Sequence, residues 1–414
     1  PANGCAEFGS VLNGEKCSQL RHWINEQRPL HSGIFYESPE AFQAKGLVVG
    51  YVQSGKTANF TGVMAKAIDA GYRLLIVLSG TQNMLREQTQ RRIDMELVGK
   101  EGIRPHNNPD PIHDYSNDPA WEDAFVEYGG RPKDLGGTGI IRLTQAKQDF
   151  KLLEAGITHL LDLEEEKDQN HLDKPINHLN NLKRSNARII VAKKNSTVLR
   201  KLVTNLAALP ESVRSQLPAL LIDDESDQAS VNTIKPDYKW FKREKQKRTA
   251  INQRLSSILE LLPRCQYVGY TATPFANVFI DPDDGADIFP KDFIISLTQP
   301  QHYMGAADFH DLALFSPDPA HTLTNEEAHV RSVTRVPGDD DLDLQAAIDM
   351  FVLTGAIKLF RENNGGSGDW RHHTMLVHES VRVADHDILA TRLRDLWQHS
   401  GYSSGPGLTR LQQI

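Results

Sequence analysis

One short stretch of the chain has residue types and a spacing that suit the binding of a polyphosphate. Residues 50–57 read Gly-Tyr-Val-Gln-Ser-Gly-Lys-Thr and match the pattern G-x-x-x-x-G-K-[ST]. Gly50 and Gly55 lack a Cβ, so the backbone can wrap around a phosphate with its N–H groups turned inward. Lys56 can then reach the β- and γ-phosphates, and the Thr57 hydroxyl can ligate Mg²⁺. We therefore expect ATP and Mg²⁺ as cofactors, held by Gly50, Gln53, Ser54, Gly55, Lys56 and Thr57.

A second group of candidate residues follows the apolar run at 219–222. The chain continues there as Asp223-Asp224-Glu225-Ser226-Asp227. Magnesium prefers hard oxygen ligands, and an attacking water needs a base beside it. If the segment aligns with the Asp-Glu-x-Asp box of helicases, Asp224 orders the magnesium ion and Glu225 activates the attacking water. Lys56 is the third candidate catalytic residue. Asp223 is the alternative metal ligand, and a solvated acidic turn is the alternative for the whole segment.

Two threonines follow another apolar run, at 267–270. The sequence there continues Thr271-Ala-Thr273-Pro. Hydroxyls at the end of a strand can hydrogen-bond the acidic box and relay the nucleotide state to a bound partner, so Thr271 and Thr273 are candidate coupling residues. An ordinary strand-to-turn junction is the alternative. The order of the three segments, phosphate loop, acidic box and Thr-Ala-Thr, strengthens the first interpretation.

These groups need a scaffold that brings the ends of several strands together. Short apolar runs recur between segments of helical pattern, the clearest of which is 195–209, behind an Asn195/Ser196 cap. Short apolar strands that alternate with helices predict an α/β fold with a parallel sheet covered on both faces. The expected strands are 47–49, 74–78, 140–143, 189–192, 220–222 and 267–270.

Composition divides the chain into segments. Residues 1–45 predict an N-terminal helical extension, and 46–330 predict an ATPase lobe with an irregular insertion near 99–139, which is rich in Pro, Asn, Asp and Gly. Residues 331–343 predict a linker. Residues 344–414 begin with a helix at 344–361, and a strand at 374–378 would open a second lobe. The chain starts without methionine and stops soon after that strand, so we expect a fragment of a longer protein.

The overall composition is typical of a cytoplasmic globular protein. The 414 residues are 39% hydrophobic and 24% charged, and the net charge is −8, which argues against a globally basic nucleic-acid coat protein. The cysteines Cys5, Cys17 and Cys265 are far apart, as in a reducing compartment, and give no metal signal. No apolar run approaches the roughly 20 residues of a membrane span, and no signal peptide is visible. We expect no membrane partner.

The order of the segments resembles lobe one of a superfamily-two helicase. The amino-acid sequences of the segments are more similar still to the Z1 (Z-one) domain family, whose alternative name includes the word endonuclease. The similar segments are 46–62, 75–80, 88–92, 221–230, 268–277, 292–297 and 375–378. The resemblance implies a RecA-like sheet for lobe one and the start of a second RecA-like lobe at 344–414. It also implies a bacterial protein encoded near DNA-modification and phage-defence genes, with other defence-system proteins as partners. One departure is that no arginine-finger motif occurs before Ile414.

The residues themselves give little support to nuclease chemistry, which needs clustered carboxylates. Asp162, Glu165 and Lys167 have a D-x-x-E-x-K spacing but lie in a polar run that is typical of solvated charge. His372 and His373 would point to opposite faces of a strand and cannot share a metal site without distortion. Surface or packing roles are therefore favoured for His372, His373 and His378.

Two basic segments are candidates for contact with DNA. In the run at 239–248, Lys239, Lys242, Arg243 and Lys247 can neutralise phosphates and Trp240 can stack on a base. A solvated helix is the alternative for this run. The second candidate patch follows the second expected strand, where helicase-like lobes touch the nucleic-acid backbone, and comprises Arg86, Arg91 and Arg92.

The sequence thus predicts an ATP-driven, helicase-like DNA translocase or remodeller of a bacterial defence system. Two other functions stay open. One is a switch that binds ATP to assemble a protein complex without moving along DNA. The other is a subunit of a DNA endonuclease whose cutting residues lie elsewhere.

Overall fold

The computed structural model describes residues 40–103, 113–130, 139–147, 163, 166–230, 249–278, 288–301, 303–309, 329–330, 340–366, 370, 372–380, 382–403 and 405–414. The chain divides into two compact units, a first unit at Pro1–Tyr303 and a second unit at Met304–Ile414. This division precedes the predicted linker at 331–343, most of which lies outside the described residues. So do residues 1–39, and with them most of the predicted N-terminal helical extension.

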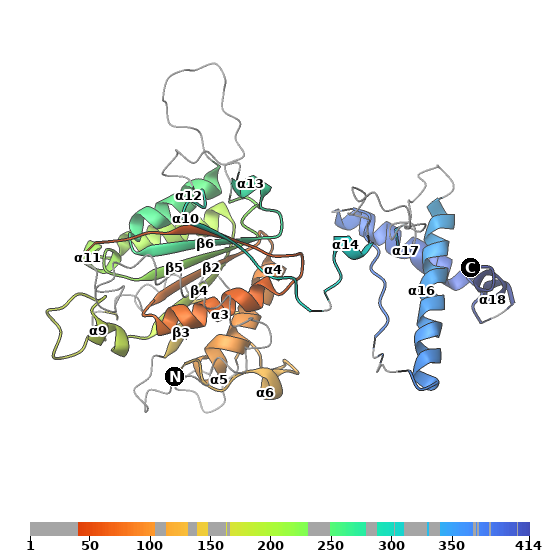
Figure 1. The fold of residues 1–414 in the computed structure, drawn as a ribbon, viewed down its shortest axis with the longest axis horizontal. Helices are drawn as coiled ribbons and strands as arrows, with labels where there is room; N and C mark the ends of the chain where they lie inside the picture. Colours follow the sequence, from red (N-terminus) through yellow and green to blue (C-terminus); the bar gives the residue numbers. More distant parts are fainter. Residues whose placement is uncertain are drawn as a thin grey trace, which may run out of the picture. The chain divides into compact units, whose positions relative to one another are not determined.

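The described part of the first unit is built on one parallel sheet (Figure 1). Its strand order is β3-β4-β2-β5-β6-β1-β7, and every pairing is parallel. All six predicted strands are confirmed, and the α/β fold class with them. The strands are β1 (Lys45–Val49), β2 (Leu74–Ser79), β3 (Ile140–Arg142), β4 (Ala187–Lys193), β5 (Ala219–Asp224), β6 (Cys265–Thr271) and β7 (Phe293–Ser296).

Helices cover both faces of this sheet, as predicted (Figure 1). Successive side chains of a strand point to opposite faces, so the buried residues of β2 pack into two cores, one on each face of the sheet. Leu74, Ile76 and Leu78 join one core with α10 and α12, whereas Leu75 and Val77 join the other with α3. The α-helices in the described residues of this unit are α3 (Lys56–Asp69), α4 (Asn83–Ile93), α5 (Gly99–Ile103), α6 (Trp121–Ala124), α9 (Leu179–Arg184), α10 (Ser196–Ala208), α11 (Glu211–Arg214), α12 (Ala250–Leu261) and α13 (Phe275–Val278).

Two local expectations meet different outcomes. The helix behind Asn195 is confirmed as α10, and the Asn195 side chain accepts hydrogen bonds from the backbone N–H groups of Thr197 and Val198. The strand β7 was not predicted. Its residues alternate between partial burial and exposure, because β7 pairs only with β1 at the edge of the sheet, so it lacks the apolar run of a central strand.

The predicted irregular insertion at 99–139 is more ordered than expected. Where it is described, it contains α5 and α6, and the rings of Tyr115, Trp121 and Phe125 are buried against one another. A π-helix, η2 (Asp94–Val98), joins α4 to α5. The described parts of this segment therefore have a core of their own, which the Pro, Asn, Asp and Gly content did not indicate.

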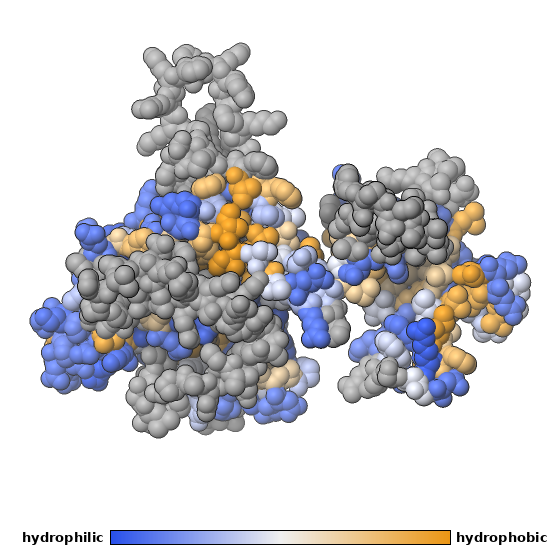
Figure 2. Space-filling model, viewed as in Figure 1, coloured by the Kyte–Doolittle hydropathy of each residue, from blue (hydrophilic) through white to orange (hydrophobic). Residues whose placement is uncertain are grey.

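The described residues of the second unit form helices only: α14 (Ala306–Phe309), α16 (Asp340–Asn363), α17 (Val383–His399) and α18 (Gly405–Leu411). The helix predicted at 344–361 is confirmed as α16. Asp349 on α16 accepts hydrogen bonds from the Tyr402 hydroxyl (2.5 Å) and from Arg410 of α18 (3.2 Å). Figure 2 shows apolar side chains along α16, where Leu359 and Phe360 are exposed.

The strand predicted at 374–378 is wrong, because those residues adopt no regular structure. Half-buried and exposed residues still alternate there as in a strand, with Met375 and Val377 half-buried and Leu376 88% exposed. A strand needs a neighbour to accept its backbone hydrogen bonds, and the described residues of this unit provide none. Within the part of the chain that is described, no helix has the length and apolar composition that crossing a bilayer requires.

Candidate functional site

The phosphate-loop sequence connects β1 to the 14-residue helix α3. Gly50 N–H donates to the Thr271 carbonyl (3.0 Å), which ties the start of the loop to the end of β6. The loop then turns through two left-handed residues, Gln53 (φ 54°) and Gly55 (φ 88°). Gly55 is the N-cap of α3 and has no side chain to cap it, so the first N–H groups of the helix are free for a ligand, as an anion site requires.

The loop residues fit a polyphosphate in three respects. A Cβ at Gly50 would lie 3.1 Å from Cγ of Lys56 and 3.2 Å from Oγ of Ser54, so a side chain there would displace both residues by a few tenths of an ångström. The buried Ser54 hydroxyl has no hydrogen-bond partner in the described residues, as expected of a group that serves a ligand. The Lys56 ammonium meanwhile donates to the Tyr51 carbonyl (3.3 Å) within the same loop.

The acidic segment lies at the carboxyl end of β5, and its first two carboxylates have different surroundings. Asp223 is completely buried, its carboxylate is 3.2 Å from Nζ of Lys194, and it accepts a hydrogen bond from the Tyr267 hydroxyl (2.7 Å). Its neighbour Asp224 points to the other face of the strand and is half-buried. Asp223 is therefore committed to a structural ion pair.

The pKa of Asp224 depends on burial and on the charges around it, Lys56 of the phosphate loop among them. Burial, and next the charge of Glu225, raise the pKa of Asp224 to about 6, whereas Lys194 and Lys56 oppose the shift. Because β1 and β5 both pair in parallel with β6, the loop that carries Lys56 and the carboxyl end of β5 that carries Asp224 lie at the same edge of the sheet. A divalent cation between them would favour the ionised carboxylate further.

Glu225 occupies a strained backbone position at the turn after β5. Its φ is 52°, a left-handed conformation that costs a residue with a Cβ about 1 kcal/mol. The Glu225 carbonyl accepts a hydrogen bond from Gln228 N–H (2.9 Å) and another from the Lys194 ammonium. Strain held by surrounding contacts is common at functional sites.

The two coupling candidates hydrogen-bond the acidic box, as predicted, through Asp227, the last residue of the box, for which no role of its own was predicted. Asp227 accepts hydrogen bonds from the Thr271 hydroxyl (2.7 Å) and the Thr273 hydroxyl (2.8 Å). The sheet order explains the contact, because β6 lies between β5, which carries the acids, and β1, which carries the loop. The described geometry thus brings Lys56, Asp224, Thr271 and Thr273 to one edge of the sheet.

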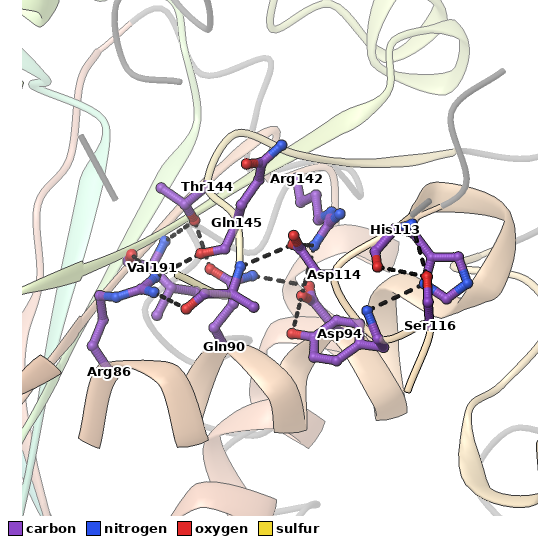
Figure 3. Close-up of polar contacts among 12 residues, drawn as sticks. Arg86, Gln90, Asp94, His113, Asp114, Ser116, Arg142, Thr144, Gln145 and Val191 are labelled. Carbon is purple, nitrogen blue, oxygen red and sulfur yellow. Dashed lines mark hydrogen bonds and ion pairs between the residues drawn. The ribbon is translucent and has the colours of Figure 1, made fainter. Parts of the chain in front are cut away.

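The candidate DNA-binding arginines on α4 make contacts within the protein. The prediction that Arg86 contacts DNA is wrong. Arg86 is 2% exposed, and its guanidinium donates to the carbonyls of Gln145 (3.0 Å), Ala146 and Val191 (3.4 Å), so it cannot reach a phosphate (Figure 3). Arg91 pairs with both carboxylate oxygens of Asp118, at 2.5 and 2.8 Å.

Arg92, the third residue of that patch, pairs with Glu96 one turn later (2.9 Å) and is partly exposed. The other candidates for DNA contact, Lys239, Trp240, Lys242, Arg243 and Lys247, lie outside the described residues. So do Asp162 and Glu165 of the nuclease-like spacing. His373 stacks on Phe351 (4.3 Å between ring centroids), as expected of a packing histidine.

A buried polar cluster behind α4 contains an acid that sequence reasoning missed. Asp94 in η2 has no exposed surface and accepts hydrogen bonds from Tyr115 (2.7 Å), Gln90 (2.9 Å) and Arg142 (3.1 Å) (Figure 3). Burial raises the pKa of Asp94 to about 6, against the opposing effects of Arg142, Tyr115 and Gln90. Arg142 also pairs with Asp114 (2.7 Å), so the cluster fastens the 113–130 segment to β3.

Comparison with known proteins supports one part of the family resemblance. The family profile of the Z1 domain matches residues 343–406, within the second unit, and does not extend to the phosphate loop. No curated protein matches the sequence. The solved structure of Drosophila ORC bound to AT-rich DNA and Cdc6 is similar at 11% identity over 84% of this chain and 82% of that chain, with a TM-score of 0.19. A TM-score that low supports no argument about fold or function.

Proposed function

We propose that this protein is an ATP hydrolase of the P-loop class with a RecA-like first unit. The observation that carries the proposal is the convergence at one sheet edge of a glycine loop ahead of α3 and a half-buried Asp224 within the electrostatic reach of Lys56. Parallel α/β sheets bind ligands at the carboxyl ends of their strands, which is where all these groups lie.

The residues divide the work as follows. The backbone of residues 50–55 and the start of α3 bind the phosphates, and Lys56 leaves the Tyr51 carbonyl to pair with them. Thr57 and Asp224 would hold Mg²⁺, which neutralises charge on the phosphates when bound. Glu225 orients and deprotonates the attacking water. Thr271 and Thr273 report the state of the acidic turn through Asp227.

Two substitutions in the full chain test this assignment. Lys56→Ala removes the charge that binds the phosphates, so we expect ATP binding to weaken by at least about tenfold. Glu225→Gln keeps the shape and removes the base, so we expect binding to persist and turnover to fall by about a hundredfold or more. The measurements are binding of a fluorescent ATP analogue and steady-state phosphate release.

Lys183→Ala on α9 and Glu260→Gln on α12 are the matched controls, because both side chains are exposed and lie on helices outside the site. Both controls should behave as the unmodified protein. Full turnover by Glu225→Gln would remove Glu225 from the mechanism. Turnover that is also insensitive to Lys56→Ala would end the proposal of an ATPase at this loop.

We further propose that hydrolysis drives movement on DNA or remodelling of it, in the cytoplasm of a bacterium and together with other defence-system proteins. The support is the family resemblance, the Z1 match at 343–406 and the basic run at 239–248. The same ATPase assay with duplex and single-stranded DNA is the test. Stimulation by one DNA form identifies a nucleic-acid motor and the strand form on which it acts.

A second candidate function is an ATP-dependent switch that assembles a protein complex. It is favoured by the engagement of Arg86, Arg91 and Arg92 within the protein, which leaves the DNA-binding proposal without its second basic patch. A slow ATPase indifferent to both DNA forms supports the switch. A divalent-dependent nicking activity that survives Lys56→Ala would instead support a subunit of an endonuclease.

A further inference from the structure

A buried lysine outside the phosphate loop makes direct contact with the acidic turn. Lys194 follows β4 and is 1% exposed. Its ammonium lies 3.2 Å from a carboxylate oxygen of Asp223 and donates to the carbonyl of Asp224 (2.7 Å) and to the carbonyl of Glu225. The ammonium thus donates two hydrogen bonds to backbone carbonyls of the turn, and its charge lies beside the buried carboxylate of Asp223.

The sheet order makes this contact a bridge between strands. β4 and β5 are separated by β2, so the Lys194 side chain must cross the end of β2 to reach the acidic turn. The Lys194 backbone N–H donates to the Gly80 carbonyl at the end of β2 (2.8 Å). One residue thus fixes the carboxyl ends of three neighbouring strands relative to one another.

Pairing with Asp223 does not by itself account for these contacts. Asp223 already accepts the Tyr267 hydroxyl, and a charge partner needs only the ion pair. The other two bonds of Lys194 end on the backbone of the two residues proposed to bind the metal and to activate water. They also hold Glu225 in its left-handed conformation, where φ is 52°.

We propose that Lys194 is a positioning residue for ATP hydrolysis, which fixes the backbone of Asp224 and Glu225 and so aims their side chains at the phosphate loop. The inference rests on the proposed ATPase function. Lys194 is buried beneath the turn. Its role would be to hold the backbone of the turn, and it would not touch the nucleotide itself.

The test compares three variants of the full chain: Lys194→Met, Asp223→Asn and the double variant. Methionine is unbranched and only one atom shorter than lysine, and it removes the donors. We expect Lys194→Met to bind the ATP analogue within about threefold of the unmodified protein and to lose kcat by at least about tenfold, because small displacements of catalytic groups have large effects on rate. Asp223→Asn keeps Lys194 over the turn, so its kcat should stay within about threefold.

The double variant separates the two roles of Lys194. Removing both charges relieves the unpaired buried Asp223 left by Lys194→Met, so thermal stability should recover. If Lys194 positions the turn, kcat stays low in the double variant despite that recovery. Recovery of kcat together with stability would show that Lys194 only balances Asp223, and would overturn the proposal. An unmodified protein without Lys56-dependent ATP hydrolysis would instead overturn the proposed function itself.

Discussion

At the scale of single residues, burial decides what a charge can do. Lys56 and Lys194 are both nearly buried, but Lys56 has one backbone acceptor within its own loop, whereas Lys194 contacts three acceptors. The same contrast separates Asp223, which is paired and inaccessible, from the half-buried Asp224. Function at this site belongs to the charged groups that structural contacts leave available.

Arg86 provides a prediction at this scale. Arg86→Met would leave three backbone carbonyls without the guanidinium that they now share, and we expect it to lower the free energy of unfolding by about 3 kcal/mol. The matched control is Arg92→Met on the same helix, which removes a surface pair worth less than about 1 kcal/mol. Chemical denaturation measures both. Equal costs would mean that the buried contacts of Arg86 do not stabilise the fold.

At the scale of elements, the joint between α4 and α5 combines a π-helix with a buried acid. A π-helix widens the turn by one residue per hydrogen bond, and η2 carries Asp94 into the polar cluster with Arg142 and Tyr115. The ordered 113–130 segment is anchored there and covers one face of the sheet with its aromatic rings. The element therefore depends on a carboxylate whose ionisation is costly.

The pH dependence of stability tests that carboxylate. Its pKa in the folded protein is raised to about 6 from the ordinary 3.8, so the stability that it contributes is fully present below pH 3.8 and lost as the pH rises through about 6. Relative to Asp94→Asn, the unmodified protein should gain about 1 kcal/mol between pH 7.5 and pH 5. Denaturation curves at the two pH values give the difference.

Asp118→Asn is the control for this experiment. Pairing with Arg91 lowers the pKa of Asp118, so it titrates below pH 5 and its contribution should not change over the same interval. If the difference in free energy of unfolding between the unmodified protein and Asp94→Asn is also the same at pH 7.5 and pH 5, Asp94 keeps an ordinary pKa in the folded state.

At the scale of the whole molecule, the question is where an acidic protein can bind a polyanion. The net charge of −8 repels DNA at a distance, so binding requires a local concentration of free basic side chains. The arginines of α4 do not provide it, because each is paired or buried. The run at 239–248 becomes the remaining candidate from the sequence.

Charge reversal tests that run. Arg243→Glu with Lys247→Glu should weaken duplex binding and flatten the dependence of the affinity on salt, because fewer counterions are released per complex. Arg200→Glu, an exposed position on α10, is the matched single reversal and should have little effect. Unchanged affinity of the double variant at low salt would exclude this run as a DNA-binding surface and favour the ATP switch.

Local patterns predicted the first unit well, because its strands are buried on both faces and are therefore continuous apolar runs. The phosphate loop and the Asn195 cap are also local, since their residues act on backbone groups a few positions away. The structural roles of Arg86, Lys194 and Asp94 could not be predicted, because their side-chain partners lie 21 or more residues along the chain, apart from Gln90, which is one turn before Asp94. The segment at 374–378 shows the opposite error, since a strand pattern forms no strand without a neighbour.

The position of β1 in the sheet has a consequence for the order of folding. Both neighbours of β1 are distant in sequence: Lys45 pairs with Tyr267 on β6, and Gly46 pairs with Phe293 on β7. Contacts across such separations are slow to form, because closing a long loop costs entropy before any pairing stabilises it. During synthesis from the N-terminus, β1, which leads into the phosphate loop, cannot complete its pairing in the sheet until β7 has left the ribosome. The proposed nucleotide site is thus among the last parts of the described sheet to be completed, although its loop precedes six of the seven strands in the sequence.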